Sequence, residues 1–177
     1  MLLSYAVLGC QLVVAGVFAL SSSGKLRDPA AFARSLEAFG IAAGSRRALA
    51  VALIGAELAV VPLTLWRPLA AAGLLLAAAL LAVFAAAIAR TVRAGREVRC
   101  RCFGADGAVL RPAHAWRNVA LAVVALAGAA LAASDPAGRI EAGGAVVVAA
   151  AAAAVLLLLW AFDDIVELLA RRAGAAA

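Results

Sequence analysis

The chain has 177 residues, 67% of them hydrophobic, and a formal net charge of +6. Soluble domains are about 45–50% apolar, so this composition, concentrated in long uncharged runs, predicts an integral membrane protein. The basic residues do not indicate nucleic-acid binding, because they fall between the apolar runs, as membrane topology requires. We expect one membrane domain over residues 1–177, an all-α bundle of four to five transmembrane helices.

The first apolar run, residues 2–22, is close to the roughly 20 residues that cross a bilayer. No Lys or Arg precedes it, so we expect a retained span rather than a cleaved signal peptide. Asp28 and Pro29 then fit the cap and first turn of a short amphipathic helix. Its apolar residues share one face; they are Phe32, Leu36 and Phe39. We expect this helix to lie in the membrane interface or, alternatively, to pack on the bundle.

Four further apolar runs complete the predicted spans: residues 48–66, 69–89, 116–133 and 142–162. After the third span, basic residues recur at every third position, at Arg90, Arg93, Arg96 and Arg99. This spacing predicts that the third helix continues through Arg99 into the headgroup zone. The connection around residues 134–138 is rich in turn-forming residues.

The distribution of positive charge predicts an orientation in the cell membrane. Fourteen of the sixteen Lys and Arg residues follow the first span, the third span or the last span, whereas Arg67 and Arg139 lie on the other side. The positive-inside rule places the larger group in the cytoplasm. The N-terminus would then be outside, and the segment after the third span would be cytoplasmic.

That segment contains two thiols one residue apart, in Cys100-Arg101-Cys102-Phe103-Gly104. Three arginines surround them: Arg96, Arg99 and Arg101. Nearby cations favour the thiolate, which is the reactive form of cysteine, and strained, exposed disulfides are the exchangeable ones. The spacing fits a redox-active dithiol, which is our main interpretation, and equally the alternative of two ordinary loop cysteines. Cys10 lies about twelve residues, or ~18 Å, from the loop end of its span, so we expect it to serve in packing.

Glu57 lies in the middle of the second span. A carboxylate at this depth costs several kcal/mol unless it is neutral, paired or facing a polar cavity. It is therefore a candidate proton site, ligand contact or partner for a cation on another helix. The structural alternative is a protonated side chain that hydrogen-bonds a serine, Gln11 or the backbone.

Polar residues also gather where the fourth span begins. His114, Arg117 and Asn118, together with Trp116, are expected to form a polar pocket near the dithiol. His114, the single histidine, is a candidate base or metal ligand, or else an ordinary interface residue. We expect no metal site, because two cysteines this close together with one histidine do not make a zinc site. Two thiolates leave copper(I) as the alternative.

Three regions carry a resemblance to a known family. They are Phe18-Ala19-Leu20-Ser21-Ser22-Ser23-Gly24-Lys25-Leu26 with Asp28, Phe32 and Phe39-Gly40; Glu57-Leu58; and Cys100-Arg101-Cys102-Phe103-Gly104 followed by Trp116-Arg117-Asn118. Over residues 5–133 the chain resembles the methylamine utilisation protein MauE family, within the wider MauE/DoxX group of redox-associated membrane proteins. The fifth span adds little to the likeness.

The resemblance implies a bundle of four or five transmembrane helices that supports disulfide formation or electron transfer, often beside a thioredoxin-like partner. It also implies action outside the cytoplasm, because the archetype assists maturation of a disulfide-rich quinoprotein subunit there. That location disagrees with the charge distribution. Lys25 joins His114, Arg117 and Asn118 as a candidate cofactor-binding residue.

Together, these features favour a thiol–disulfide oxidoreductase or its accessory membrane subunit. In this interpretation Cys100 and Cys102 exchange electrons with a partner protein, and Glu57 handles protons or contacts a quinone. The rival interpretation is a non-enzymatic small transporter or assembly factor centred on Glu57, in which the cysteines are incidental.

Overall fold

The computed structural model describes residues 1–95, 99–100, 108–109, 111–134 and 140–175. Five of its helices are long and apolar enough to cross a membrane, which confirms the predicted all-α, multi-pass architecture. The elements, in chain order, are α1 (Leu2–Arg27), α2 (Pro29–Ser35), η1 (Leu36–Phe39), α3 (Ala43–Leu65), η2 (Arg67–Leu69), α4 (Ala70–Arg93), β1 (Arg99–Cys100), β2 (Ala108–Val109), α5 (Pro112–Ser134) and α6 (Ala142–Ala175).

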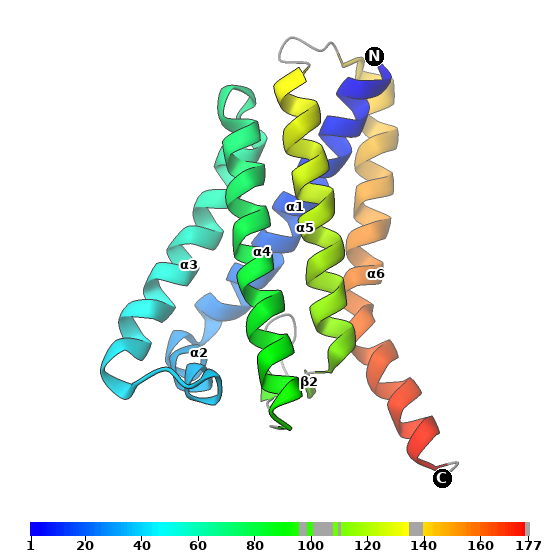
Figure 1. Ribbon diagram of the computed structural model, residues 1–177. Helices are drawn as coiled ribbons and strands as arrows, with labels where there is room; N and C mark the ends of the chain where they lie inside the picture. The colour runs from blue at the N-terminus through cyan, green and yellow to red at the C-terminus, as the bar shows by residue number, and fades with distance from the viewer. Residues whose placement is uncertain (96–98, 101–107, 110, 135–139, 176–177) are drawn as a thin grey trace.

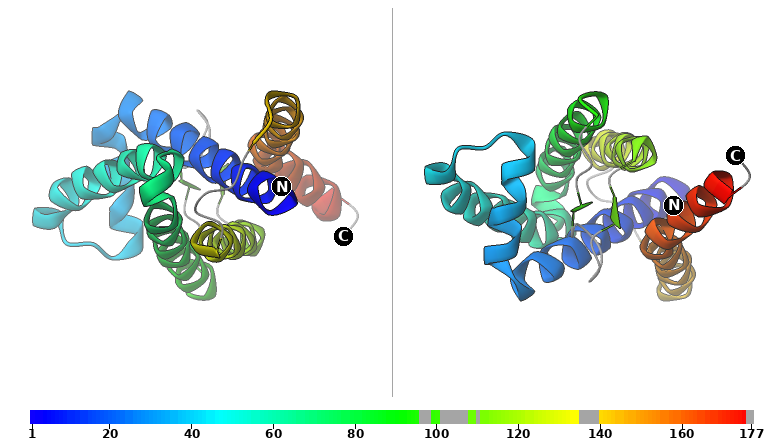
Figure 2. Two further views of the ribbon diagram at one scale, coloured as in Figure 1. Left: turned by 90° about the horizontal axis from the view of Figure 1, so that it is seen from above. Right: turned by 90° about the horizontal axis from the view of Figure 1, so that it is seen from below.

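The five long helices run between two ends of an elongated bundle (Figure 1). Helix α1 crosses the bundle obliquely and contacts α3, α5 and α6, while α4 packs against α3 and α5. Seen along its length, the bundle has α3 and α6 on opposite sides of α1 (Figure 2). We call the end where α1 and α4 finish and α3 and α5 begin the basic end. The described Lys and Arg residues of the loops after α1 and α4 belong to it.

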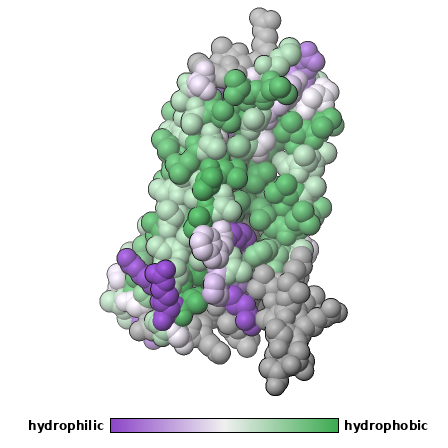
Figure 3. Space-filling view, turned by 45° about the vertical axis from the view of Figure 1, so that its right-hand side comes forward, coloured by the Kyte–Doolittle hydropathy of each residue, from purple (hydrophilic) through white to green (hydrophobic). Residues whose placement is uncertain are grey.

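The interior is apolar at the centre of the bundle. Its buried cluster combines residues from α1, α3, α4 and α5, including Phe18, Val60, Leu74 and Ala125. The outer surface is apolar too: green hydrophobic residues cover the middle of one face, and hydrophilic residues gather toward its ends (Figure 3). An apolar belt between polar ends is the surface that a bilayer requires.

The short helix after α1 forms as its sequence predicts. Asp28 caps it by accepting a hydrogen bond from the Ala31 N–H at 2.8 Å, and Gly40 ends η1 in the left-handed conformation, at φ 82°. Arg46 then ties this segment to the start of α3, donating to the carboxylate of Glu37 at 2.7 Å and to the Ile41 carbonyl at 2.8 Å. Leu36 is buried, so the apolar face of this segment packs on the bundle.

Glycines allow close helix contacts between α3 and α4 and between α1 and α5. A Cβ at Gly73 of α4 would lie 2.5 Å from the backbone nitrogen of Thr64, so only glycine allows α3 and α4 to approach this closely. A Cβ at Gly128 of α5 would lie 2.7 Å from the Cβ of Cys10. Cys10 therefore packs at the contact between α1 and α5, as predicted.

The predicted continuation of the third helix through Arg99 is wrong. Helix α4 ends at Arg93, and Gly95 adopts a φ of 66°. The N–H of Gly95 donates to the Val92 carbonyl at 3.0 Å, which closes the helix end in the manner of a glycine C-cap. Arg99 belongs instead to strand β1. The conformational freedom of Gly95 thus overrides the basic periodicity.

Candidate functional site

The centre of the candidate site is an ion pair between α1 and α3. Lys25, in the last turn of α1, donates to Oε1 of Glu57, and their side chains are 3% and 0% exposed. Pairing offsets part of the cost that an isolated charge would have in this buried place. Pairing with a cation on another helix was one of the roles predicted for Glu57.

The ammonium group of Lys25 has further partners. It donates to the Ser21 hydroxyl at 2.6 Å, one helical turn earlier. It also lies 5.2 Å from the ring centroid of Phe32 and 5.3 Å from that of Phe84, within the range of cation–π attraction. An ammonium has three donors, and two of them are used by Ser21 and Glu57. Among the described residues, the structure gives no acceptor for the third.

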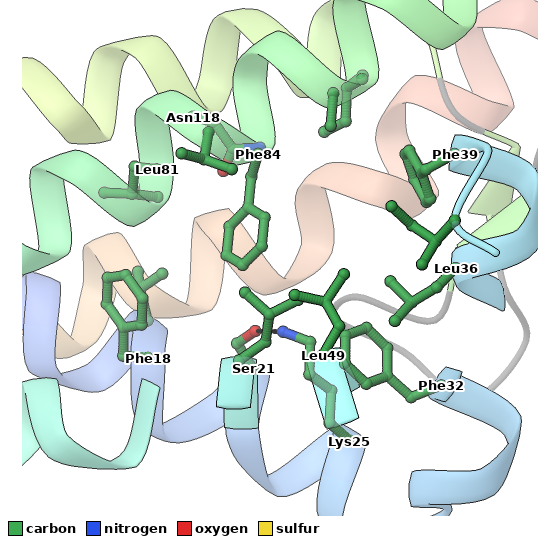
Figure 4. Close-up of a pocket in the computed structure, with 16 residues that line it drawn as sticks. Phe18, Ser21, Lys25, Phe32, Leu36, Phe39, Leu49, Leu81, Phe84 and Asn118 are labelled. Carbon is green, nitrogen blue, oxygen red and sulfur yellow. Dashed lines mark hydrogen bonds between the residues drawn. The ribbon is translucent and has the colours of Figure 1, made fainter. Parts of the chain in front are cut away.

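A cavity of about 200 Å³ opens beside this cluster (Figure 4). Its walls come from α1, the α2–η1 segment, α3, α4 and α5. The aromatic lining residues are Phe18, Phe32, Phe39 and Phe84; the polar ones are Ser21, Lys25 and Asn118. The predicted amphipathic face is thus the wall of a cavity, because Phe32, Leu36 and Phe39 all line it.

A second polar cluster lies at the start of α5. His114, Arg117 and Asn118 are all buried. The ring of Phe162 from α6 stands edge-on to His114 at 6.0 Å between centroids, and the guanidinium of Arg117 lies 5.4 Å from that ring. Nδ1 of His114 lies within hydrogen-bond distance of both the Arg111 backbone nitrogen, at 3.0 Å, and the Arg111 carbonyl oxygen, at 3.2 Å. His114 and Arg117 are therefore fixed between α5 and α6.

The expected four-residue pocket forms only in part. Trp116 is 72% exposed and turns away from its three polar neighbours, so its inclusion was wrong. On a helix, residue 116 lies off the face shared by 114, 117 and 118. Asn118 reaches the Lys25 cavity, whereas His114 and Arg117 contact Phe162. The structure thus divides the candidates between two adjoining sites.

Gln11 does not bind Glu57, which excludes one of the predicted structural partners of that carboxylate. Its side-chain amide donates to the Thr64 carbonyl at 2.9 Å. That carbonyl lies in the last turn of α3, where backbone acceptors have no partner within the helix. Gln11 therefore stabilises the far end of α3, away from the basic end.

The first cysteine of the predicted dithiol lies in a short hairpin. Strands β1 and β2 pair antiparallel, with Cys100 opposite Ala108, and they lie at the basic end (Figures 1 and 2). Cys102 falls in the connection between them and lies outside the described residues. The described part of the chain contains no group of three His, Cys, Asp or Glu side chains arranged to hold a metal ion.

The helices and the buried polar cluster define a multi-pass membrane protein. Residues 3–132 match the family described as methylamine utilisation protein MauE, so the chain belongs to the MauE family. This match spans α1 to α5 and ends before α6. No curated protein matches the chain. No solved structure matches it either.

Proposed function

We propose that this protein is a membrane-embedded thiol–disulfide exchange component that uses Cys100 and Cys102. The observation that carries the proposal is the antiparallel hairpin, whose register sets Cys100 opposite Ala108 and leaves the second thiol in the short connection. Cys100 and Cys102 are separated by one residue, so the two thiols are suited to alternate between dithiol and disulfide. Membership of the MauE family supports the proposal.

The exchange conserves atoms and electrons. The thiolate sulfur of one cysteine attacks a partner's disulfide, and a mixed disulfide forms as the partner's other sulfur leaves as a thiolate. The second cysteine of the pair then attacks the mixed disulfide. The partner leaves as a dithiol, and Cys100 and Cys102 become joined. The same steps in reverse oxidise the partner. We propose a thioredoxin-like protein as this partner.

We propose further that the basic end faces the cytoplasm. The described cations at this end include Arg27, Arg34, Arg46, Arg47, Arg90 and Arg93, and the insertion bias opposes their translocation. Cytoplasmic thiols are kept reduced by glutathione and thioredoxin. In this orientation the dithiol would receive electrons from the cytoplasmic side more readily than it would oxidise a partner.

Trapping of the mixed disulfide tests the function. Replacing the resolving cysteine should stop the exchange halfway, so either Cys102→Ser or Cys100→Ser should accumulate a covalent partner that reductant releases. The Cys10→Ser variant is the matched control, because Cys10 packs between α1 and α5. Absence of a reducible adduct in both variants, with normal activity in the double Ser variant, would refute the redox function.

One observation favours a second candidate function. The buried Lys25–Glu57 pair lies beside a cavity, an arrangement that suits a small transporter or assembly factor centred on Glu57. In that case the double Ser variant would be fully active and Glu57→Gln would not. The redox proposal expects the double Ser variant to be inactive.

A further inference from the structure

We propose that the cavity beside Lys25 binds a neutral, lipid-soluble ring compound bearing a carbonyl oxygen, of the quinone class. Its use as an electron carrier rests on the proposed function, whereas its binding does not. Four features define the ligand: the free donors on the cavity wall, the local charge balance, the aromatic lining and the route of access.

Two polar groups on the cavity wall have N–H donors that a hydrogen-bond acceptor in the cavity could satisfy. The Lys25 ammonium is buried, lines the cavity and has one N–H without an acceptor among the described residues. Asn118 is buried as well, lines the same cavity, and makes no side-chain hydrogen bond within the described part of the chain. Buried donors are nearly always satisfied. A carbonyl oxygen in the cavity would satisfy them, and an acyl chain would not.

The charges of the cluster favour a neutral acceptor over an anion. Glu57 already neutralises Lys25, and its second carboxylate oxygen, Oε2, is buried without a hydrogen-bond partner among the described residues. A ligand carboxylate would place a second negative charge beside one ammonium in a low-dielectric interior. A ketone oxygen accepts the same hydrogen bond without that repulsion.

The lining and the volume favour a ring. Phe18, Phe32 and Phe84 present aromatic side chains to the cavity (Figure 4), and aromatic pairs stack in offset or edge-to-face arrangements. A protein cavity of about 150 Å³ takes benzene. The present volume of about 200 Å³ therefore accommodates a single substituted ring or two fused rings.

Access is from the apolar surface. Val83 of α4 lines the cavity and is 59% exposed, so the cavity reaches the outer face of the helices that lipid would cover. A lipid-soluble molecule can enter there, with its tail left in the bilayer. This route excludes most water-soluble metabolites.

Binding is tested with the Cys100→Ser/Cys102→Ser protein in lipid nanodiscs. The probe is a photoreactive benzoquinone with every ring position substituted, so that it cannot add to a thiol. We expect the probe to label peptides from α1 and α4 saturably. The same benzoquinone without the photoreactive group should compete with the probe and abolish this labelling. The matching alkylbenzene, which lacks the carbonyl oxygens, should displace it at least about tenfold more weakly, because the loss of one good hydrogen bond costs about that factor.

Three variants locate the site. Ala87→Phe fills the cavity and should weaken binding about tenfold or more, whereas Ala79→Phe, on the exposed face of the same helix, should leave it unchanged. Asn118→Leu keeps the volume, removes the amide and should weaken binding several-fold. Equal displacement by the alkylbenzene, or unchanged binding in both Ala87→Phe and Asn118→Leu, would overturn the proposal. If the benzoquinone binds as expected but neither Cys100→Ser nor Cys102→Ser traps a mixed disulfide, only the thiol-exchange proposal is refuted.

Discussion

Lys25 and Glu57 form an ion pair across α1 and α3 in which both side chains are almost completely buried. Thirty-two residues separate them in sequence, so the pair fixes the position of the end of α1 against the middle of α3. Ser21, Phe32 and Phe84 surround the ammonium. The pair and the residues around it therefore join four elements, α1, α2, α3 and α4, at the cavity.

The first prediction concerns the stability of this pair. Lys25→Met and Glu57→Leu should each destabilise the protein by about 3–5 kcal/mol, because each leaves a buried charge alone, whereas the double variant should lose much less than the sum. Unfolding of the purified protein by denaturant measures all three. The exposed Glu37–Arg46 pair is the control, and Glu37→Gln should cost at most about 1 kcal/mol. Additive single effects at Lys25 and Glu57 would contradict the pairing.

The second prediction concerns the charge of Glu57. Glu57→Gln keeps an acceptor for Lys25 but cannot take up or release a proton. If Glu57 handles protons, the folded Gln variant should reduce thiol exchange by at least about tenfold, within the range typical of general acid–base catalysis. The rate of mixed-disulfide turnover measures this. A well-folded Gln variant with a normal rate would assign the carboxylate a purely structural role.

The third prediction concerns the contact between α3 and α4. Gly73→Ala should destabilise the protein by about 1–3 kcal/mol, because the new methyl group meets backbone atoms that cannot move aside. Gly55→Ala in α3 is the matched control, since nothing lies within 4 Å of its Cβ position. Helix propensity makes this control neutral or slightly stabilising. Thermal unfolding of the two variants compares them directly, and equal midpoints would refute the close approach.

The fourth prediction concerns orientation. A membrane-impermeant maleimide applied to intact cells should leave Cys100 and Cys102 unlabelled and should label them only after lysis. The basic residues of this end oppose its translocation. An engineered cysteine in the opposite connection, at Arg67→Cys, should be labelled before lysis. Labelling of Cys100 or Cys102 in intact cells, with a cytoplasmic control thiol protected, would reverse the orientation and favour the oxidising role.

The number and type of the spans could be predicted from the sequence, because a run of about 20 apolar residues has few other stable structures. The end of the first span could not. The first span was predicted over residues 2–22, yet α1 continues to Arg27. Ser22 and Ser23 donate to the carbonyls of Ala19 and Leu20, three residues earlier, so their hydroxyl groups are satisfied within the helix.

That extra turn explains why the ion pair was missed. A lysine placed in a loop has no reason to meet a mid-span glutamate, whereas Lys25 on a continuing, oblique helix reaches it. The available signal was the spacing of Ser21 and Lys25, four residues apart and hence on one helical face. The roles of Phe18 and Phe84 were also hidden, because apolar residues in a span look alike until their neighbours are known.

Helix α6 lies beyond the segment that matches the family, and it carries the backbone once more from one end of the bundle to the other. After α5 the backbone has crossed four times and has returned to the end where α1 begins (Figure 1). The fifth crossing carries the following residues to the same end as the hairpin. A reporter fused after residue 134 and one fused after α6 should therefore occupy different compartments. A reporter attached at Ala175 should therefore share its compartment with the β1–β2 hairpin.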